Sequence, residues 1–217
     1  THFKLSDYFD PDPKAPDKIY TTRGAFLPPI VFDPLKNGIP PSMLSSTDSS
    51  QLLGLLVARA TLEDAYDGRF EAADKSRISV ILGVTGGQEL FGQMAARLQR
   101  PAWEAGMRAA GIDEAQVQEA CAKISGSFVP WTESSFPGLL GNVVAGRIAN
   151  RLDTGGTNAI TDAACASSFA ALSMGVDELL LGKADLVLSG GVDTLNDVFM
   201  HMCFSKTPAL SPSGRCR

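Results

Sequence analysis

The segment TNAITDAACASSFAALSMGVDELLLGKADLVLSGG, residues 157–191, contains the pattern that decides the fold. Residues 157–163 have the composition of a β-strand, and a helix is predicted from there through about Leu181, where Gly182-Lys183-Ala184 ends it. Residues 186–189 form a second short apolar run, closed by Gly190-Gly191. A strand, a helix and a strand on this scale indicate a βαβ crossover, so we expect a parallel or mixed sheet with covering helices.

The residues upstream add further elements to this unit. Apolar residues recur at helical spacing in residues 52–62, behind N-cap candidates at 47–50, and this helix is expected to end near 66–68. Ile78–Gly83 has the composition of a buried strand. The remaining expectations are a helix at 89–98 opened by Gly86-Gly87, a helix at 113–123, a loop at 126–137 and a helix at 138–150.

The domain organisation predicted from composition is one α/β core preceded by an irregular segment. Residues 1–50 are rich in Pro and Asp, which prevents long helices there. A disordered linker is the alternative for such a composition. We favour an ordered segment wrapped over the core of residues 51–217, because it carries apolar side chains for which burial is expected: Phe26, Leu27, Ile30, Val31 and Phe32.

Composition excludes several classes of function. The chain has 217 residues and a net charge of −5 without a run of Lys or Arg, which argues against nucleic acid as a partner. Its four cysteines form no CxxC pair and only two His are present, so neither a zinc site nor a disulfide framework is indicated. We expect reduced thiols, a cytoplasmic location and no membrane span. Neither end has the character of a terminus, so both are expected to be cut from a longer chain.

Cys165 is the candidate nucleophile. It lies between a predicted strand end and a predicted helix start, among small neighbours that permit a sharp turn. Unpaired N–H groups and partial positive charge at a helix N-terminus favour thiolate over thiol, and the same N–H groups can stabilise an oxyanion. The alternative from placement alone is a small buried side chain. Residues 83–87 offer a weaker candidate, a phosphate loop, against which a tight strand-to-helix turn is favoured because no phosphate-binding motif is complete.

Residues 162–169, DAACASSF, resemble the nucleophile motif of β-ketoacyl synthases in type I polyketide and fatty-acid synthases. The resemblance extends over essentially the whole chain, through residues 7–10, 21–26, 141–150, 184–193 and 210–216. Residues 47–53 and 204–209 resemble a narrower group, the synthases that make polyunsaturated fatty acids and related long-chain lipids. The resemblance implies a thiolase-like layered fold (αβαβα), of which this chain would supply mostly the N-terminal half.

The chemistry that the resemblance implies is decarboxylative Claisen condensation. Cys165 would accept an acyl group from a phosphopantetheine arm and be attacked by the carbanion formed when malonyl on an acyl carrier protein loses CO₂. The chain itself would bind no cofactor. Implied partners are the acyl carrier protein, acyl and malonyl thioesters and a second copy of the chain, paired through strands near the nucleophile. Phe136, Ser168 and Phe204 are the implied substrate-binding residues, with core packing as the alternative for Phe136.

The resemblance also implies what these residues lack. The family uses two His from the second half of its fold, and neither His2 nor His201 matches those motifs. The family's glycine-rich loop is absent too, so we expect the 217 residues alone to be inactive in condensation. Two other functions stay open: a non-catalytic partner that sets chain length, and an unrelated cysteine hydrolase. Lys206 and Arg215 could attract an acidic carrier protein, although simple surface solvation is the stronger expectation for isolated bases.

Overall fold

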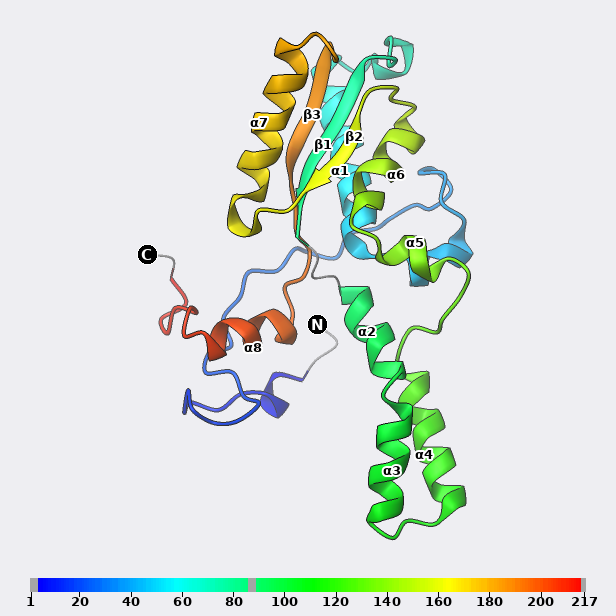
Figure 1. Ribbon diagram of the computed structural model, residues 1–217, viewed down its shortest axis with the longest axis vertical. Coiled ribbons are helices and arrows are strands. Elements are labelled where there is room, and N and C mark those ends of the chain that lie inside the picture. Colours follow the sequence, from blue (N-terminus) through cyan, green and yellow to red (C-terminus); the bar gives the residue numbers. More distant parts are fainter. Residues whose placement is uncertain (1–3, 86–88, 216–217) are drawn as a thin grey trace. The chain divides into compact units, whose positions relative to one another are not determined.

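The computed structural model describes residues 4–85 and 89–215 (Figure 1). His2, Cys216 and the Gly86-Gly87 pair expected to open a helix lie outside the described residues. The chain divides into two compact units, one formed by Phe32–Thr194 and the other by Thr1–Val31 with Leu195–Arg217. The first unit holds the α/β core and the Cys165 turn.

A three-stranded parallel sheet forms the centre of the larger unit. Its strands are β1 (Ile78–Val84), β2 (Asn158–Thr161) and β3 (Leu186–Val192), in the order β2-β1-β3. Every residue of β1 is buried, as expected for the central strand of a sheet covered on both faces. The predicted βαβ crossover is therefore confirmed, and all the described strand pairs are parallel.

Helices cover both faces of this sheet, as Figure 1 shows. On one face lies α7 (Ser167–Leu180), whose small residues Ala171 and Gly175 are buried. On the other lie α1 (Ser49–Ala65) and α6 (Asn142–Leu152). Apolar residues of α1, β1 and α6 fill the layer between them, including Leu55, Leu62, Val80, Val144 and Ile148.

The outer face of α7 is apolar and exposed. Its exposed apolar side chains are Phe169, Leu172, Met174, Val176, Leu179 and Leu180. An exposed apolar helix face of this kind is typical of a surface that another part of a protein covers.

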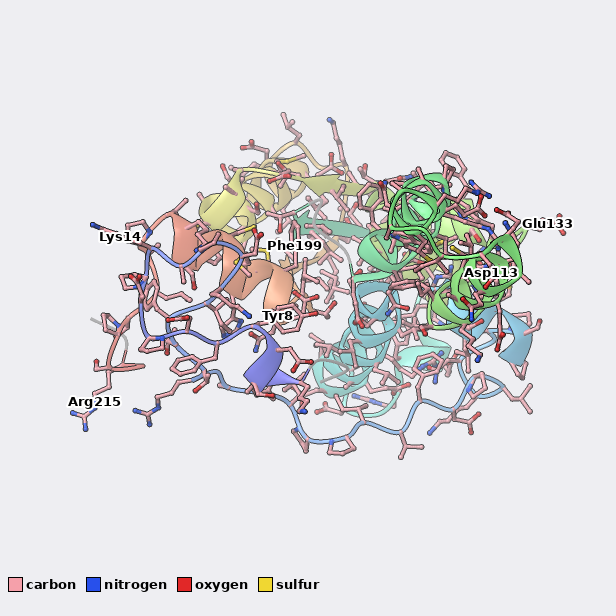
Figure 2. The ribbon with its side chains drawn as sticks, turned by 90° about the horizontal axis from the view of Figure 1, so that it is seen from below. Tyr8, Lys14, Asp113, Glu133, Phe199 and Arg215 are labelled. Atoms are coloured by element: carbon pink, nitrogen blue, oxygen red, sulfur yellow. The ribbon has the colours of Figure 1, made fainter. Side chains whose placement is uncertain are left out.

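Four further helices connect β1 to α6. They are α2 (Glu89–Arg97), α3 (Arg100–Ala109), α4 (Glu114–Gly126) and the short α5 (Ser135–Leu139). Helices α3 and α4 form a hairpin, and Asp113, labelled in Figure 2, is the N-cap of α4. The Trp103 ring stacks on that of Phe128 at 6.1 Å between centroids. The hairpin therefore carries its own small set of stabilising contacts.

The smaller unit joins segments from the two ends of the sequence. It contains a single turn of 3₁₀ helix at Leu5–Asp7 and the helix α8 (Val198–Lys206). The hydroxyl of Tyr20 donates a 2.7 Å hydrogen bond to the carbonyl of Leu210, and Asn196 donates one of 2.6 Å to the carbonyl of Ala25. Two more 3₁₀ turns, Pro41–Ser46 and Phe70–Ala72, belong to the larger unit.

Several sequence-based boundaries are wrong. Helix α3 lies where no helix was expected. A helix can form there although it contains Pro101, because this proline lies in the first turn, where proline is tolerated. Helix α8 was missed, α4 continues to Gly126, and α5 occupies part of the expected loop. Helix α6 begins at Asn142 rather than Gly138, and β3 continues through Val192 because it still pairs with β1 there.

The expected burial of the apolar residues in the N-terminal segment is also largely wrong. Phe26, Leu27, Ile30 and Val31 are exposed, and only Phe32 packs partly buried against the core. Residues 22–31 adopt neither helix nor strand, and Pro28-Pro29 removes two backbone donors there. Because residues 22–31 pair with no strand that the structure describes, most of the surface of their side chains remains exposed to solvent.

The described residues contain neither a helix that could span a membrane nor a cluster of side chains that could hold a metal ion. No helix within residues 4–85 and 89–215 is long and apolar enough to cross a membrane. In the same described ranges, no three His, Cys, Asp or Glu side chains are grouped to hold a metal ion. Cys121, Cys165 and Cys203 are free thiols.

Candidate active site

Cys165 lies where the sequence predicted, in the turn between β2 and α7. It is the central residue of a three-residue 3₁₀ turn, Ala164–Ala166, which is followed directly by the first residue of α7. Its side chain is exposed. The turn follows the carboxyl end of β2, the edge of a parallel sheet at which ligands commonly bind.

Two side chains hold this turn in place. The carboxylate of Asp162 accepts a 3.0 Å hydrogen bond from the N–H of Ala164. The hydroxyl of Ser167 accepts one of 2.9 Å from the N–H of Ala163 and donates one of 2.6 Å to the carbonyl of Ala164. Ser167 is buried and follows the turn directly, so its hydroxyl ties the first residue of α7 back to the start of the turn.

The backbone immediately before Cys165 is strained. Ala164 has φ = 49°, in the left-handed region that costs a non-glycine residue about 1 kcal/mol. Such conformations persist only where surrounding contacts impose them, and they are frequent at active sites. Sequence reasoning could not find this feature, because alanine has no preference for the left-handed region.

The first turn of α7 supplies polar groups beside the thiol. Its N-cap residue, Ala166, contributes no side-chain hydrogen bond to the N–H groups of that turn. Helix N-termini carry partial positive charge and bind anionic groups. The arrangement can therefore receive a thiolate or the negatively charged oxygen of a tetrahedral intermediate.

The other residues expected in the site are distributed over three helices. Ser168 is exposed in the first turn of α7, next to the Cys165 turn in sequence. Phe136 lies on α5 with 70% of its surface exposed. Phe204 lies on α8 in the smaller unit, 42% exposed. A substrate-binding role for each of the three stays a prediction.

His201 and Lys206 both lie on α8 and both have backbone partners. Nδ1 of His201 is 2.9 Å from the carbonyl oxygen of Asp197, and its Nε2 is 3.4 Å from that of Arg23. The ammonium group of Lys206 donates a hydrogen bond to the carbonyl of Ala15. These contacts join both side chains to the backbone within the smaller unit.

Sequence reasoning missed a buried polar cluster in the larger unit. Asp48 was expected only as an N-cap, and its Oδ1 does accept a 2.9 Å hydrogen bond from the N–H of Ser50. Its Oδ2 also accepts one of 3.1 Å from the N–H of Leu90 in α2. Gln51 is fully buried and bonded to Arg147, a contact between residues far apart in the sequence. The one sequence feature that points to this cluster is Gln51 itself, a polar residue within the otherwise apolar stripe of a helix.

Comparison with known sequences identifies relatives over nearly the whole chain. The chain is 38% identical over 207 residues to one subunit of the polyunsaturated fatty acid synthase from Thraustochytrium, a match that covers 95% of this chain and 7% of that protein. It is 30% identical over 210 residues to polyketide synthase GfsB from Streptomyces halstedii, covering 96% of this chain and 3% of that protein. The chain thus spans a small part of each relative.

Solved structures show the same fold. The oxazolomycin ketosynthase domain OzmH KS7 from Streptomyces albus aligns with a TM-score of 0.69 at 22% identity, over 100% of this chain and 33% of that one. The ketosynthase from module 6 of the bacillaene synthase of Bacillus subtilis aligns with a TM-score of 0.68 at 21% identity, over 98% of this chain and 29% of that one. These likenesses confirm the thiolase-like fold.

A family model described as "Beta-ketoacyl synthase, N-terminal domain" matches residues 1–217. This match covers the sheet, the turn that holds Cys165 and both compact units. The chain therefore belongs to the β-ketoacyl synthase family, as a member of its N-terminal domain.

Proposed function

We propose that this chain carries the acyl-accepting nucleophile of a condensing enzyme that elongates fatty-acid or polyketide chains, and that Cys165 is that nucleophile. One observation carries the proposal: in a chain of this family, an exposed thiol lies on a constrained turn between a strand end and a helix start. The similarity to a polyunsaturated fatty acid synthase supports a lipid product.

The first half of the reaction is acyl transfer. The Cys165 thiolate attacks the carbonyl carbon of an acyl thioester on a phosphopantetheine arm, and the former carbonyl oxygen becomes an oxyanion. N–H groups at the start of α7 stabilise that oxyanion. The bond from carbon to the phosphopantetheine sulfur then breaks, the departing thiolate takes up a proton, and the acyl group remains on Cys165.

The second half forms the new carbon–carbon bond. Malonyl on an acyl carrier protein loses CO₂, and the resulting carbanion attacks the carbonyl carbon of the Cys165 thioester. Collapse of the tetrahedral intermediate releases the Cys165 thiolate and leaves a β-ketoacyl group, two carbons longer, on the carrier. The two His that this family uses in decarboxylation match neither His2 nor His201, so this half requires residues beyond these 217.

The proposal includes the partners and the location expected for such an enzyme. Phosphopantetheine on an acyl carrier protein brings the substrates, and the chain forms a homodimer through β2. Strand β2 supports this because it is an edge of the described sheet and directly precedes the Cys165 turn. The free thiols Cys121, Cys165 and Cys203 support a cytoplasmic location.

Acyl transfer to individual cysteines tests the nucleophile. The full-length protein is incubated with hexanoyl-N-acetylcysteamine, and acylation of each cysteine is measured by peptide mass spectrometry. We expect Cys165 to be acylated and Cys203, which is also exposed, to remain free. The Cys165→Ser variant should lose the thioester, whereas Cys203→Ser should keep it. Equal acylation of Cys165 and Cys203 in the wild type would exclude an activated nucleophile.

Condensation separates the enzyme from a silent partner. The acylated protein is supplied with malonyl-loaded acyl carrier protein, and both CO₂ release and the β-ketoacyl product are measured. An enzyme forms the product only when Cys165 is present. A chain-length-setting partner would release no CO₂ and form no β-ketoacyl product, even with Cys165 acylated.

A further inference from the structure

Two glycines on neighbouring strands lie under the first turn of α7. Gly83 of β1 and Gly191 of β3 are directly paired in the parallel sheet. A Cβ atom on Gly83 would lie 2.6 Å from the carbonyl oxygen of Ser167 and 2.7 Å from the nitrogen of Ser168. Both distances are shorter than real Cβ contacts, and the obstructing atoms are backbone. Only glycine at position 83 therefore allows α7 to approach the sheet this closely.

Gly191 makes a milder contact with the same turn. A Cβ atom there would lie 3.2 Å from the Cβ of Ser168, a side-chain atom that a shift of a few tenths of an ångström relieves. Its neighbour in the same strand, Gly190, differs, because a Cβ atom there would have no atom of residues 4–85 or 89–215 within 4 Å. The close approach is thus confined to the side of the sheet that carries α7.

The peptide between Ser167 and Ser168 is linked directly to the Cys165 turn. The buried hydroxyl of Ser167 bonds to Ala163 and Ala164, so a displacement of this peptide moves the turn with it. The backbone of the sheet at Gly83 therefore determines the distance between the sheet and the Cys165 turn. The strained φ of Ala164 shows that the turn is held in a conformation it would not adopt freely.

We propose that Gly83, together with Gly191, is a positioning residue: the missing side chains seat the first turn of α7 on the sheet and so fix the Cys165 sulfur relative to the N–H groups of that turn. This inference rests on the proposed acyl transfer to Cys165. It deepens that proposal by naming what aligns the nucleophile. A side chain at position 83 lifts the turn, and a misplacement of about 1 Å at a reacting atom costs up to ~100-fold in rate.

The test compares Gly83→Ala with Gly190→Ala in the full-length protein. Three rates are measured by peptide mass spectrometry: acyl transfer from hexanoyl-N-acetylcysteamine to Cys165, alkylation of Cys165 by iodoacetamide, and alkylation of Cys121. Acyl transfer needs an aligned sulfur and oxyanion donors, whereas iodoacetamide needs only an accessible thiol. Cys121 is fully buried, so its alkylation reports loss of structure.

The expected result is a selective loss of acyl transfer. In Gly83→Ala, acyl transfer falls by ~10- to 100-fold while alkylation of Cys165 changes by less than ~3-fold and Cys121 stays protected. Gly190→Ala retains wild-type acyl transfer within ~2-fold, because its Cβ atom meets none of the residues that the structure describes. Wild-type acyl transfer in a folded Gly83→Ala variant would overturn the inference and leave the proposed function intact.

If Gly83→Ala exposes Cys121 and so has lost its structure, the Gly191→Ala variant tests the inference instead. Its milder contact predicts a ~3- to 10-fold loss of acyl transfer with Cys121 protected, and an unchanged rate there would overturn the inference. Failure of the proposed function is distinguishable, because the wild type itself would then show no preferential acylation of Cys165. That outcome would remove this inference as well.

Discussion

Nε of Arg147 donates a 2.9 Å hydrogen bond to Oε1 of Gln51, and both side chains are buried, Gln51 completely and Arg147 with 8% of its surface exposed. The amide nitrogen of Gln51 lies 2.9, 3.0 and 3.3 Å from the carbonyl oxygens of Pro137, Gly138 and Leu140. One side chain on α1 thus links α6 to the short helix α5. Burial, and secondarily the charge of Arg151, lower the pKa of the Arg147 guanidinium from its ordinary value, which shows that its environment disfavours charge.

Replacing Gln51 by Ala should therefore destabilise the protein strongly. The change leaves the buried guanidinium and three carbonyl groups without this partner, for an expected loss of about 3 kcal/mol in the free energy of unfolding. Urea unfolding followed by circular dichroism measures it. Gln116→Ala, at an exposed position on α4, is the matched control and should stay within ~0.5 kcal/mol of wild type. A loss below ~1 kcal/mol for Gln51→Ala would show that water replaces these contacts.

The Gln51 cluster also illustrates which features a sequence can predict. Helix α1, strands β1 and β3 and the crossover helix α7 were predicted because their signal is local: apolar spacing and flanking turn residues lie within each element. The Gln51–Arg147 bond joins residues far apart in the chain. The sequence around either residue contains no pattern that predicts its contact with the other. Helix α3 was missed for a related reason, since Trp103 packs against Phe128 rather than against a continuous apolar stripe.

The candidate site divides in the same way. The place of Cys165 could be predicted, because a strand end, small residues and a helix start follow one another in sequence. The family resemblance supplied its proposed role. The left-handed Ala164 and the contact of Gly83 with the Ser167–Ser168 peptide could not be predicted, because both arise only when α7 packs on the sheet.

The α3–α4 hairpin should lose protection in acid. Arg108 donates two 2.8 Å hydrogen bonds to the carboxylate of Glu114, and Gln118 donates a third of the same length. The bonds from Arg108, followed by that from Gln118, lower the pKa of Glu114 from 4.5 to about 2. A carboxyl group whose pKa is lower in the folded state stabilises that state above its unfolded pKa, and the contribution is lost as pH falls from about 4.5 through about 2.

Hydrogen exchange of peptides from residues 100–126, corrected for the intrinsic exchange rate, measures this loss between pH 5 and pH 2. The Glu114→Gln variant should be less protected at pH 5 and show a weaker decline in acid. Glu119→Gln is the control, because Glu119 pairs with Lys123 within α4 and does not link α4 to α3. The ion pair is exposed, so high salt should reduce the difference between the variants. Identical pH dependence of Glu114→Gln and wild type would contradict the prediction.

Ser167→Ala should uncouple the Cys165 turn from α7. The substitution removes the hydroxyl that joins Ala163 and Ala164, at an expected cost of about 1 kcal/mol in the free energy of unfolding. Because the turn is then held less firmly, acyl transfer from hexanoyl-N-acetylcysteamine to Cys165 should fall by ~10-fold. Ser173→Ala, at an exposed position on the same helix, should change neither quantity. A Ser167→Ala variant that is destabilised but fully active would mean that the hydroxyl serves stability alone.

The same substitution at two glycines of α3 and its C-terminal turn should have opposite effects. Gly106 lies inside α3, and a Cβ atom there would meet no described residue within 4 Å, so Gly106→Ala should stabilise the helix by ~0.5–1 kcal/mol. Gly111 has φ = 81° and ends the helix, with its N–H bonded to the carbonyl of Arg108 and that of Ile112 to the carbonyl of Met107.

Gly111→Ala forces a Cβ atom into this left-handed position and should destabilise the hairpin by about 1 kcal/mol. Hydrogen exchange of peptides from residues 100–112 resolves the two effects locally, with Gly106→Ala raising protection and Gly111→Ala lowering it. The double variant should lie close to wild type, because one change acts through helix propensity and the other through backbone strain. Effects of the same sign at the two positions would mean that α3 does not end in the αL turn at Gly111.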